Sequence, residues 1–391
     1  MMPYTDFLYF GILLLYVVLP AMLFSPFKRI SRLWPVAATG IMLAIQYAGV
    51  HNLTERLQIT ELETLLVFVL LEWVVAAGFL FLRKRTANGW LFYLALFLAL
   101  APLLATRISI LAEPDFPLVF AGLSYVTFRS LDVIFGIRDE LIQTLPPVQY
   151  LMFLLFFPTI SSGPIDRYLR FAEDWKRSRS RGEFLSDLDG AIHRIFTGFL
   201  YKFILAALIK RYWLDPVAQG TDLLHIGSYM YAYTFYLFFD FAGYSAFAVG
   251  LSYVLGIHTP ENFNRPFLSR DIRDFWNRWH ISLSLWFRDH VYNRFVFAAL
   301  KGHWFKSRYT ASYLGYMLTM GLMGIWHGMA LHYLAYGLYH GVLLSATDWL
   351  GRRYKNSRLL SSSGLPWRAA SILLTFHLVA LGLLIFSGRL F

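Results

Sequence analysis

Long apolar runs separated by short polar connections make up most of the chain. The runs cover residues 7–24, 35–50, 62–82, 90–111, 118–137, 191–214, 229–255, 309–326, 331–350 and 369–386. Most of them approach the ~20 residues that a helix needs to cross the hydrocarbon core of a bilayer. The pattern therefore predicts an all-α polytopic membrane protein with about ten or eleven spanning helices.

Two segments depart from this pattern. The apolar run 150–160 is too short to span and lies among the helix breakers Pro158, Gly163 and Pro164, so we expect a re-entrant or interfacial element there. In the segment 262–290, NFNRPFLSRDIRDFWNRWHISLSLWFRDH, Arg and Asp alternate with Phe and Trp. Polar groups at membrane depth persist only where protein or a water-filled cavity shelters them, so this segment is a candidate polar site.

Composition and charge agree with a membrane protein. Of 391 residues, 57% are hydrophobic, and 35 Lys and Arg stand against 24 Asp and Glu. The cations cluster after apolar runs, at Lys28, Arg29 and Arg32, at Arg83, Lys84 and Arg85, and at Arg352, Arg353, Lys355 and Arg358. Cytoplasmic loops of membrane proteins carry this excess. We therefore expect a multi-pass protein of the cell membrane, in contact with lipid, with its N-terminus outside and no nucleic-acid partner.

The first run, 7–24, precedes the first basic residue, Lys28, and so lacks the charged leader of a cleaved signal peptide. We expect it to be a retained span. The chain has no cysteine, which excludes disulfides, thiol catalysis and cysteine-ligated metals.

Two polar features leave alternatives open. A basic tract, 167–181, carries six Lys and Arg residues, and we interpret it as a cytoplasmic loop lying on anionic lipid; docking of an acidic soluble partner is the alternative. Asp240 lies inside the apolar run 229–255. An acid at membrane depth needs partners, and we favour a structural carboxylate over a catalytic one.

Two of the eleven histidines have unusual surroundings: His280 in the motif RWHIS and His327 in GIWHG. A metal site at His327, His332 and His340 is not favoured, because their spacings match no common ligand motif. A sheltered imidazole stays neutral and can take a proton from a hydroxyl. Because GxSxG and cysteine are both absent, attack of an acceptor hydroxyl directly on an activated acyl group fits better than an acyl-enzyme.

Four motifs resemble the membrane-bound O-acyltransferase family: GLSYVTFRSLDVIFGIRD at 122–139, FPTISSGPIDRY at 157–168, the segment at 262–289, and MGIWHG at 323–328. The resemblance implies one integral-membrane domain, 1–391, with a ring of helices around a central tunnel. N-terminal spans would occupy 1–117, the catalytic core 118–350, and a loop with the last span 351–391. It also implies that His327 is the principal catalytic residue and His280 a second functional histidine.

SSGPIDRY and the compact length resemble the family members that attach D-alanine to lipoteichoic and wall teichoic acids of Gram-positive-type bacteria. This implies no permanently bound cofactor. The acyl donor would be a thioester on the phosphopantetheine of a small acidic carrier protein. The acceptor would be a teichoic acid hydroxyl or a tyrosine on a small single-span membrane partner.

The same resemblance implies carrier docking on the segment RFVFAAL. Val296 and Phe297 would be the exposed apolar contacts, and Arg294 would suit the acidic partner. The residue types alone favour ordinary packing for Val296 and Phe297.

Two other functions stay open. One is a family member that O-acetylates an exopolysaccharide such as alginate. The other is a transporter with polar residues along its path, against which stands the absence of paired broken helices in two sequence halves.

Overall fold

The computed structural model describes residues 3–24, 33–47, 50–54, 57–86, 88–112, 120–354 and 364–391. The cations Lys28, Arg29, Arg32, Lys355 and Arg358, used above as topological markers, lie outside these residues. The chain folds into two compact units. Unit 1 contains Met1–Gly198 and Tyr244–Pro260, and unit 2 contains Phe199–Gly243 and Glu261–Phe391. The sequence segments 1–117, 118–350 and 351–391 divide the chain at other places and stay predictions.

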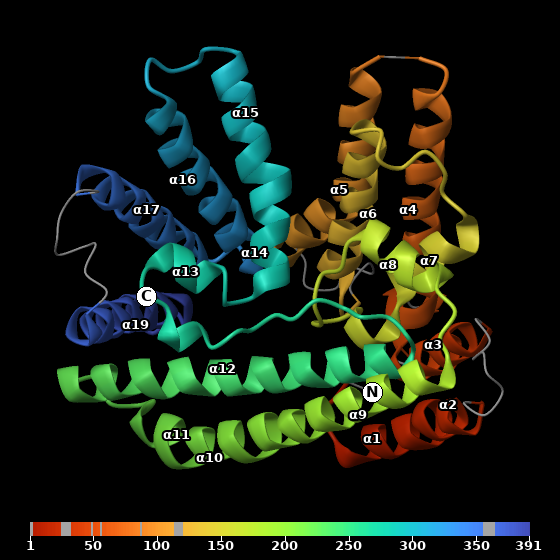
Figure 1. The fold of residues 1–391 in the computed structure, drawn as a ribbon, viewed down its shortest axis with the longest axis horizontal. Helices are drawn as coiled ribbons and strands as arrows, with labels where there is room; N and C mark the ends of the chain where they lie inside the picture. The colour runs from red at the N-terminus through yellow and green to blue at the C-terminus, as the bar shows by residue number, and fades with distance from the viewer. Residues whose placement is uncertain are drawn as a thin grey trace. The chain divides into compact units, whose positions relative to one another are not determined.

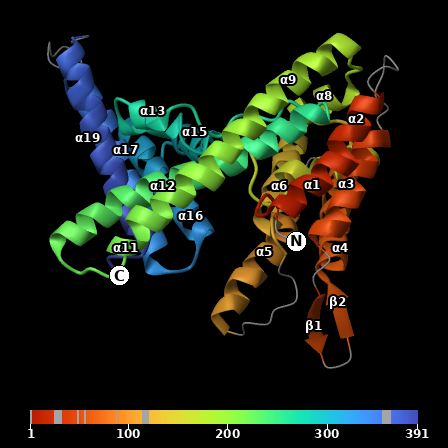
Figure 2. The ribbon, with the colours of Figure 1, turned by 90° about the horizontal axis from the view of Figure 1, so that it is seen from below.

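Unit 1 is helical except for one hairpin. Its elements are α1 (Phe7–Leu13), a π-helical turn (Leu14–Val18), α2 (Leu19–Phe24), α3 (Leu33–Gln46), β1 (Val50–Thr54), β2 (Leu57–Thr60), α4 (Glu61–Arg83), α5 (Trp90–Ala112), α6 (Leu123–Arg138), α7 (Pro147–Leu155), α8 (Tyr168–Lys176) and α9 (Arg181–Gly198). Helices α4, α5 and α6 pack against one another (Figure 1). The antiparallel hairpin β1–β2 directly precedes α4 (Figure 2), and the apolar pattern did not predict it.

The polytopic helical membrane fold is confirmed. Among the described residues, five helices are long and apolar enough to cross a bilayer: Glu61–Arg83, Trp90–Ile108, Arg181–Val217, Leu223–Val254 and Leu365–Phe386. The ten or eleven spans expected are not reached among the described residues. The apolar helices Phe7–Leu23 and Trp34–Gln46 are shorter than a span needs, α6 has 16 residues, and α17 (Leu331–Arg353) is long enough but less apolar. The ring of helices around a tunnel stays a prediction.

The short apolar run 150–160 folds as α7 followed by a 3₁₀ turn, Phe157–Thr159, and is largely buried in protein. The buried guanidinium of Arg129 on α6 donates hydrogen bonds to the carbonyl oxygens of Phe153 at 3.0 Å and Thr159 at 2.7 Å. Backbone that leaves helical geometry in a membrane protein needs such internal partners. The run therefore does not span, as its length predicted.

Most cations of the basic tract pair with acids within unit 1, and the interpretation that the tract lies on lipid stays a prediction. Four of its cations pair with acids: Arg167 with Asp132, Arg170 with Asp166 and Asp174, Arg177 with Glu183, and Arg179 with Asp187. Arg179 also donates to the carbonyl oxygens of Tyr253 at 2.8 Å and Val254 at 2.9 Å, at the C-terminal end of α12 (Leu223–Val254). These cations therefore hold the fold together and have less charge to offer to lipid or a partner.

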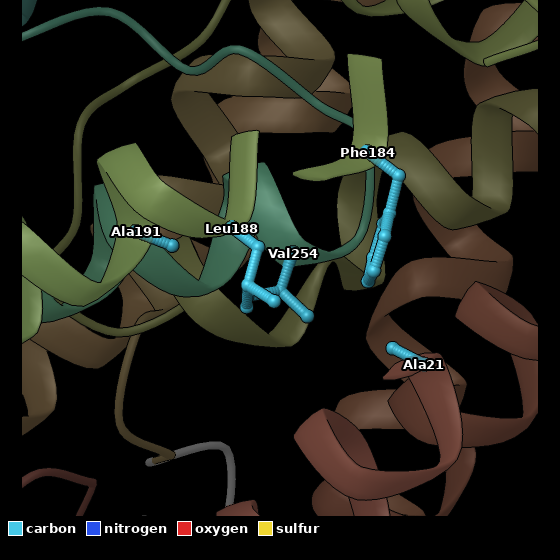
Figure 3. Close-up of a cluster of buried hydrophobic side chains, with 5 residues drawn as sticks. All are labelled: Ala21, Phe184, Leu188, Ala191 and Val254. Atoms are coloured by element: carbon cyan, nitrogen blue, oxygen red, sulfur yellow. The ribbon is translucent and has the colours of Figure 1, made fainter. Parts of the chain in front are cut away.

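A small apolar cluster lies beside this ion network. Phe184, Leu188 and Ala191 on α9 pack with Ala21 of α2 and Val254 of α12, and Figure 3 shows their side chains together. Phe184 is 1% exposed and also receives the guanidinium of Arg179 over its ring at 5.3 Å. The cluster and the ion pairs thus fasten the end of α12 to α9.

Unit 2 carries the segment 262–290. Its elements are a π-helical continuation of α9 (Phe199–Ala206), α10 (Ala207–Ile209), a second π turn (Lys210–Leu214), α11 (Asp215–Val217), α12 up to Gly243, a 3₁₀ turn (Pro266–Leu268), α13 (Ile272–Trp276), α14 (Ile281–Phe287), a third π turn (Arg288–Tyr292), α15 (Asn293–Lys301), α16 (Arg308–His327), α17 (Leu331–Arg353) and α19 (Leu365–Phe386). Helices α15 and α16 form a hairpin, and α17 packs on α16 (Figure 1).

Asp240 on α12 is paired with Lys202, whose ammonium lies 2.5 Å from the carboxylate. Lys202 belongs to the π-helical segment, where the backbone leaves regular α-helical geometry. An ion pair between two apolar helices satisfies both charges. The geometry supports the structural interpretation of Asp240.

Candidate active site

His280 and His327 line one cavity in unit 2, although 46 residues separate them in the chain. The cavity has a volume of about 70 Å³ and is otherwise lined by Leu237, Phe241, Trp276, Trp279, Leu283, Tyr336, Leu383 and Phe386. These residues come from α12, α13, α14, α16, α17 and α19 and from the connections at 277–280. We call this space the histidine cavity. The segment 262–290 and the motif GIWHG thus meet at one cavity, and the catalytic roles of the two histidines stay a prediction.

His327 is the last residue of α16. The helix can end there close to α17 because Gly324 has no side chain: a Cβ on Gly324 would lie 2.3 Å from the carbonyl oxygen of Tyr333. Gly337 on α17 allows the same approach, since its Cβ would lie 2.2 Å from the carbonyl oxygen of Met320. Small residues at helix crossings bring backbones together in membrane proteins. The glycines therefore determine where the His327 ring sits.

Aromatic rings surround the imidazole of His327. The ring of Phe386 lies 4.9 Å away edge-on, and those of Tyr333 and Tyr336 lie 6.2 and 6.3 Å away. A helix C-terminus favours positive charge nearby. The position therefore suits an imidazole that takes up a proton during a reaction.

His280 precedes α14 and has a left-handed backbone, with φ of 43° and ψ of 51°. Asn262 holds the chain in this conformation. Its carbonyl oxygen accepts from the N–H of Ile281 at 3.0 Å, and its Oδ1 accepts from the Ser282 hydroxyl at 2.6 Å. Left-handed residues other than glycine are uncommon, and they persist when surrounding contacts require them. The result is an imidazole aimed into the histidine cavity from a tightly bonded loop.

Burial controls the charge of His280, which lies outside the spanning helices. Its side chain is 4% exposed, packs edge-on against Phe241 at 4.8 Å, and has an Nε2 atom without a hydrogen-bond partner in the described residues. Burial, and secondarily the charge of His327, lower the pKa of His280 to about 3. His280 is therefore neutral at physiological pH and can donate or accept one hydrogen bond with a substrate.

A larger cavity of about 280 Å³ adjoins the same wall, and we call it the outer cavity. It is lined by Arg273, Trp276, Asn277, Ser284, Leu285, Arg288, Tyr292, Tyr316, Thr319, Met320, Met323 and Leu344. Trp276 is the one described residue that lines both cavities. The candidate site thus consists of the outer cavity, which is lined by Arg273 and Arg288 among others, and the smaller histidine cavity, which is lined by His280 and His327.

Comparison with known proteins places this geometry in a family. The model of the family described as MBOAT, membrane-bound O-acyltransferase family, matches residues 36–386. The chain belongs to the membrane-bound O-acyltransferase family. This membership replaces the transporter interpretation with that of an acyltransferase.

Curated relatives lie in two groups. The chain is similar to the teichoic acid D-alanyltransferase of Bacillus subtilis (strain 168), with 41% identity over all of this chain and 99% of the relative. It is similar to that of Streptococcus thermophilus, with 38% identity over 98% of this chain and 94% of the relative. The probable alginate O-acetylase AlgI of Pseudomonas syringae pv. tomato is 32% identical over 68% of this chain and 49% of that protein.

The three residues expected to contact a carrier lie on α15 and differ in exposure. Phe297 is 76% exposed, as expected. Val296 is half-buried, because it packs toward α16, where a Cβ on Gly315 would lie 3.0 Å from its Cγ2. Arg294 is also half-buried. The exposed apolar strip of α15 and its C-terminal turn is therefore formed by Phe297, Leu300 and Trp304 rather than by Val296.

Sequence reasoning did not identify the residues that support the site, and it weighed His340 only as a metal ligand. Asn262 and Ser282 clamp His280, and Tyr336 and His340, one helical turn apart on α17, border the aromatic wall. The sequence offered one indication of such a role: Asn262 and Ser282 lie inside the segment 262–290, which was already a candidate polar site. Among the residues that the structure describes, no group of three or more His, Cys, Asp or Glu side chains is placed to hold a metal ion.

Proposed function

We propose that the chain is a teichoic acid D-alanyltransferase. The observation that carries the proposal is full-length similarity to the Bacillus subtilis enzyme of that name, combined with two histidines that line one small cavity. The alginate relatives match only two thirds of this chain and half of their own length, which favours D-alanyl over acetyl transfer. The acyl donor would be D-alanine held as a thioester on the phosphopantetheine arm of a small acidic carrier protein.

The chemistry follows from the two imidazoles. His327 removes the proton of an acceptor hydroxyl while the hydroxyl oxygen attacks the thioester carbonyl carbon. The C–S bond then breaks, an ester forms, and the thiolate of the arm receives the proton from His327. Assistance by a general base of this kind is worth roughly 100 to 10,000-fold in rate. Neutral His280 would hold the thioester carbonyl or the acceptor by a hydrogen bond.

The proposed partners follow from the family resemblance, and exposed side chains on α15 support the carrier site. The carrier would dock on the exposed strip Phe297, Leu300 and Trp304, beside the cations Lys301 and Lys306. The acceptor is a teichoic acid hydroxyl or a tyrosine on a small single-span membrane partner. The protein would lie in the cell membrane of a Gram-positive-type bacterium with its N-terminus outside and the carrier in the cytoplasm. The arm brings its own pantetheine, so no resident cofactor is required.

Transfer from loaded carrier in reconstituted vesicles tests the reaction. We expect radiolabelled D-alanine to move from the carrier to a membrane acceptor, and His327→Ala to slow this by roughly 100 to 10,000-fold. Equal insertion of the variant in the vesicles is the control. Transfer by His327→Ala at the normal rate, or transfer of acetyl but not D-alanyl groups, would contradict the proposal.

Docking is tested by carrier pull-down. We expect Phe297→Asp to abolish capture of the carrier, because it places a like charge on an exposed apolar contact. Leu141→Asp is the matched control, since Leu141 is 63% exposed, lies outside the helices that are long and apolar enough to span, and is far from α15 in the sequence. Equal carrier capture by both variants would contradict the proposal that the carrier docks on α15.

A further inference from the structure

Trp276 occupies the wall between the two cavities. It ends the short helix α13, is 7% exposed, and lines both the outer cavity and the histidine cavity. The histidine cavity, at about 70 Å³, has room for a few water molecules or a small acyl group but not for a pantetheine arm. An arm held in the outer cavity would therefore present its acyl group to the histidines past Trp276, the residue that lines both cavities.

One hydrogen bond fixes the indole of Trp276. Its Nε1–H donates to Nδ1 of His340 on α17 at 3.3 Å, and the two rings meet edge-on with centroids 5.2 Å apart. A second tie joins the same elements, since Arg273 on α13 pairs with Asp348 on α17 at 3.0 Å. The short helix α13 is thus fastened to α17 at both ends.

His340 has no other polar partner in the described part of unit 2. Its side chain is 0% exposed, and its Nε2, which must carry the proton because Nδ1 accepts, meets no acceptor. Gly382 on α19 lies against this atom so closely that a Cβ there would be 2.5 Å from Nε2. A buried polar group with half of its hydrogen-bonding capacity unused is unfavourable for stability. Packing alone would be served better by leucine or phenylalanine.

We propose that Trp276 is a gate between the two cavities and that His340 is the positioning residue that holds it closed. The gate would keep water in the outer cavity from the acyl thioester at the histidines and admit the acyl group when the indole turns. The ligand class for this gate is a small acyl group, held as a thioester on a slender arm, that enters the histidine cavity from the outer cavity. This assignment of ligand rests on the proposed function; the gate itself rests on the geometry of Trp276 and His340.

Thiol labelling tests the gate without reference to the reaction. The chain has no cysteine, so a single introduced thiol reports on one cavity. Leu237→Cys reports on the histidine cavity and Ser284→Cys on the outer cavity. A charged, membrane-impermeant thiol reagent is added to membrane vesicles from whichever side labels Ser284→Cys.

We expect Leu237→Cys to be labelled slowly with Trp276 present and at least about tenfold faster with Trp276→Ala. His340→Leu should accelerate labelling by roughly 2 to 10-fold, which is the effect of losing one hydrogen bond. His340→Asn, whose side-chain oxygen can replace Nδ1 as the acceptor, should restore slow labelling. Trp276→Phe, which keeps a ring without the N–H, should behave like His340→Leu and guards against a misfolded Trp276→Ala protein.

The double variant separates positioning from general loosening. If His340 acts only through the indole, Trp276→Ala with His340→Leu is labelled no faster than Trp276→Ala alone. Equal labelling of Leu237→Cys in all of these backgrounds would overturn the gate, as would additive acceleration in the double variant. Transfer of D-alanine by the wild-type protein is measured on the same vesicles, so a failed reaction with an intact labelling pattern rejects the proposed function and leaves the gate standing.

Discussion

At the scale of single residues, the conformation of His280 depends on a neighbour that the sequence pattern did not single out. Asn262 accepts the bonds that follow His280 in the chain, through its backbone oxygen to Ile281 and through its side chain to Ser282. The two histidines could be chosen from their sequence surroundings and from family resemblance. Asn262 could not, because its role depends on a contact across 20 residues that only the folded chain creates.

Asn262→Ala should remove the side-chain bond of this clamp and leave the backbone bond to Ile281 in place. The Ser282 hydroxyl, which is buried, would lose its acceptor, and we expect a loss of about 1–3 kcal/mol in the free energy of unfolding. The left-handed backbone of His280 would relax, so acyl transfer should fall by about tenfold or more. Thermal unfolding in detergent and the transfer assay measure the two effects. Adding Ser282→Ala removes the hydroxyl that had donated to Asn262 and should recover part of the stability; a fully additive loss would contradict the clamp.

The neutral state of His280 makes the protein sensitive to acid. Because the folded-state pKa, about 3, lies below the unfolded value of about 6.5, the contribution of His280 to stability is complete above pH 6.5 and declines as pH falls toward 3. Between pH 7 and pH 5 the wild type should lose about 2 kcal/mol more than His280→Asn, which cannot titrate. Melting temperatures of both proteins across this range check the sign. A steeper acid loss for His280→Asn would contradict it.

At the scale of elements, helix positions followed from hydrophobicity, and irregularities did not. The predicted run 62–82 became α4 at Glu61–Arg83, and 309–326 became α16 at Arg308–His327. The π-helical turns and the hairpin β1–β2 were missed, because they change backbone geometry without changing the apolar pattern. The glycine contacts between α16 and α17 were only partly visible, since the motif GIWHG contained one of the two glycines that matter.

The α16–α17 crossing gives an element-scale prediction with an internal control. Gly324→Ala would place a Cβ 2.3 Å from a carbonyl oxygen of α17, whereas Gly321→Ala, one turn earlier, meets nothing closer than 3.7 Å. We expect Gly324→Ala to lower the free energy of unfolding by about 1–3 kcal/mol and to reduce transfer, because His327 would move. Gly321→Ala should be neutral or stabilising by up to about 1 kcal/mol. Thermal unfolding compares them directly, and equal stability of the two variants would contradict the close crossing.

At the scale of the whole molecule, the net charge did not predict which cations form ion pairs inside the protein. The excess of +11 led to a basic tract lying on lipid, yet most of that tract is engaged in unit 1. Composition counts charges but cannot pair them. The i,i+4 pairs of Arg170 with Asp166 and Asp174 are local, whereas the pair of Arg167 with Asp132 joins positions 35 residues apart that only the fold brings together. Membrane class and family could be read from the sequence, whereas the internal use of these cations required the fold.

Arg179 and Arg181 separate the two interpretations of the tract. The side chain of Arg179 is 9% exposed, pairs with Asp187, and donates to the last carbonyls of α12, whereas Arg181 is exposed. Arg179→Gln removes the guanidinium from Asp187, which keeps its contact with His258 at 2.8 Å, and it removes the bonds to the carbonyls of α12; we expect a loss of about 2–4 kcal/mol or failure to accumulate. Arg181→Gln removes the same charge and should change stability by less than about 0.5 kcal/mol. Compared with the wild type, Arg179→Gln and Arg181→Gln should both show nearly unchanged binding to anionic vesicles. Neither cation supplies the main attraction, because the protein is inserted in lipid through its apolar helices. If Arg179→Gln melts like the wild type while vesicle binding drops, the tract is a lipid-facing surface after all, and the ion network is incidental to the fold.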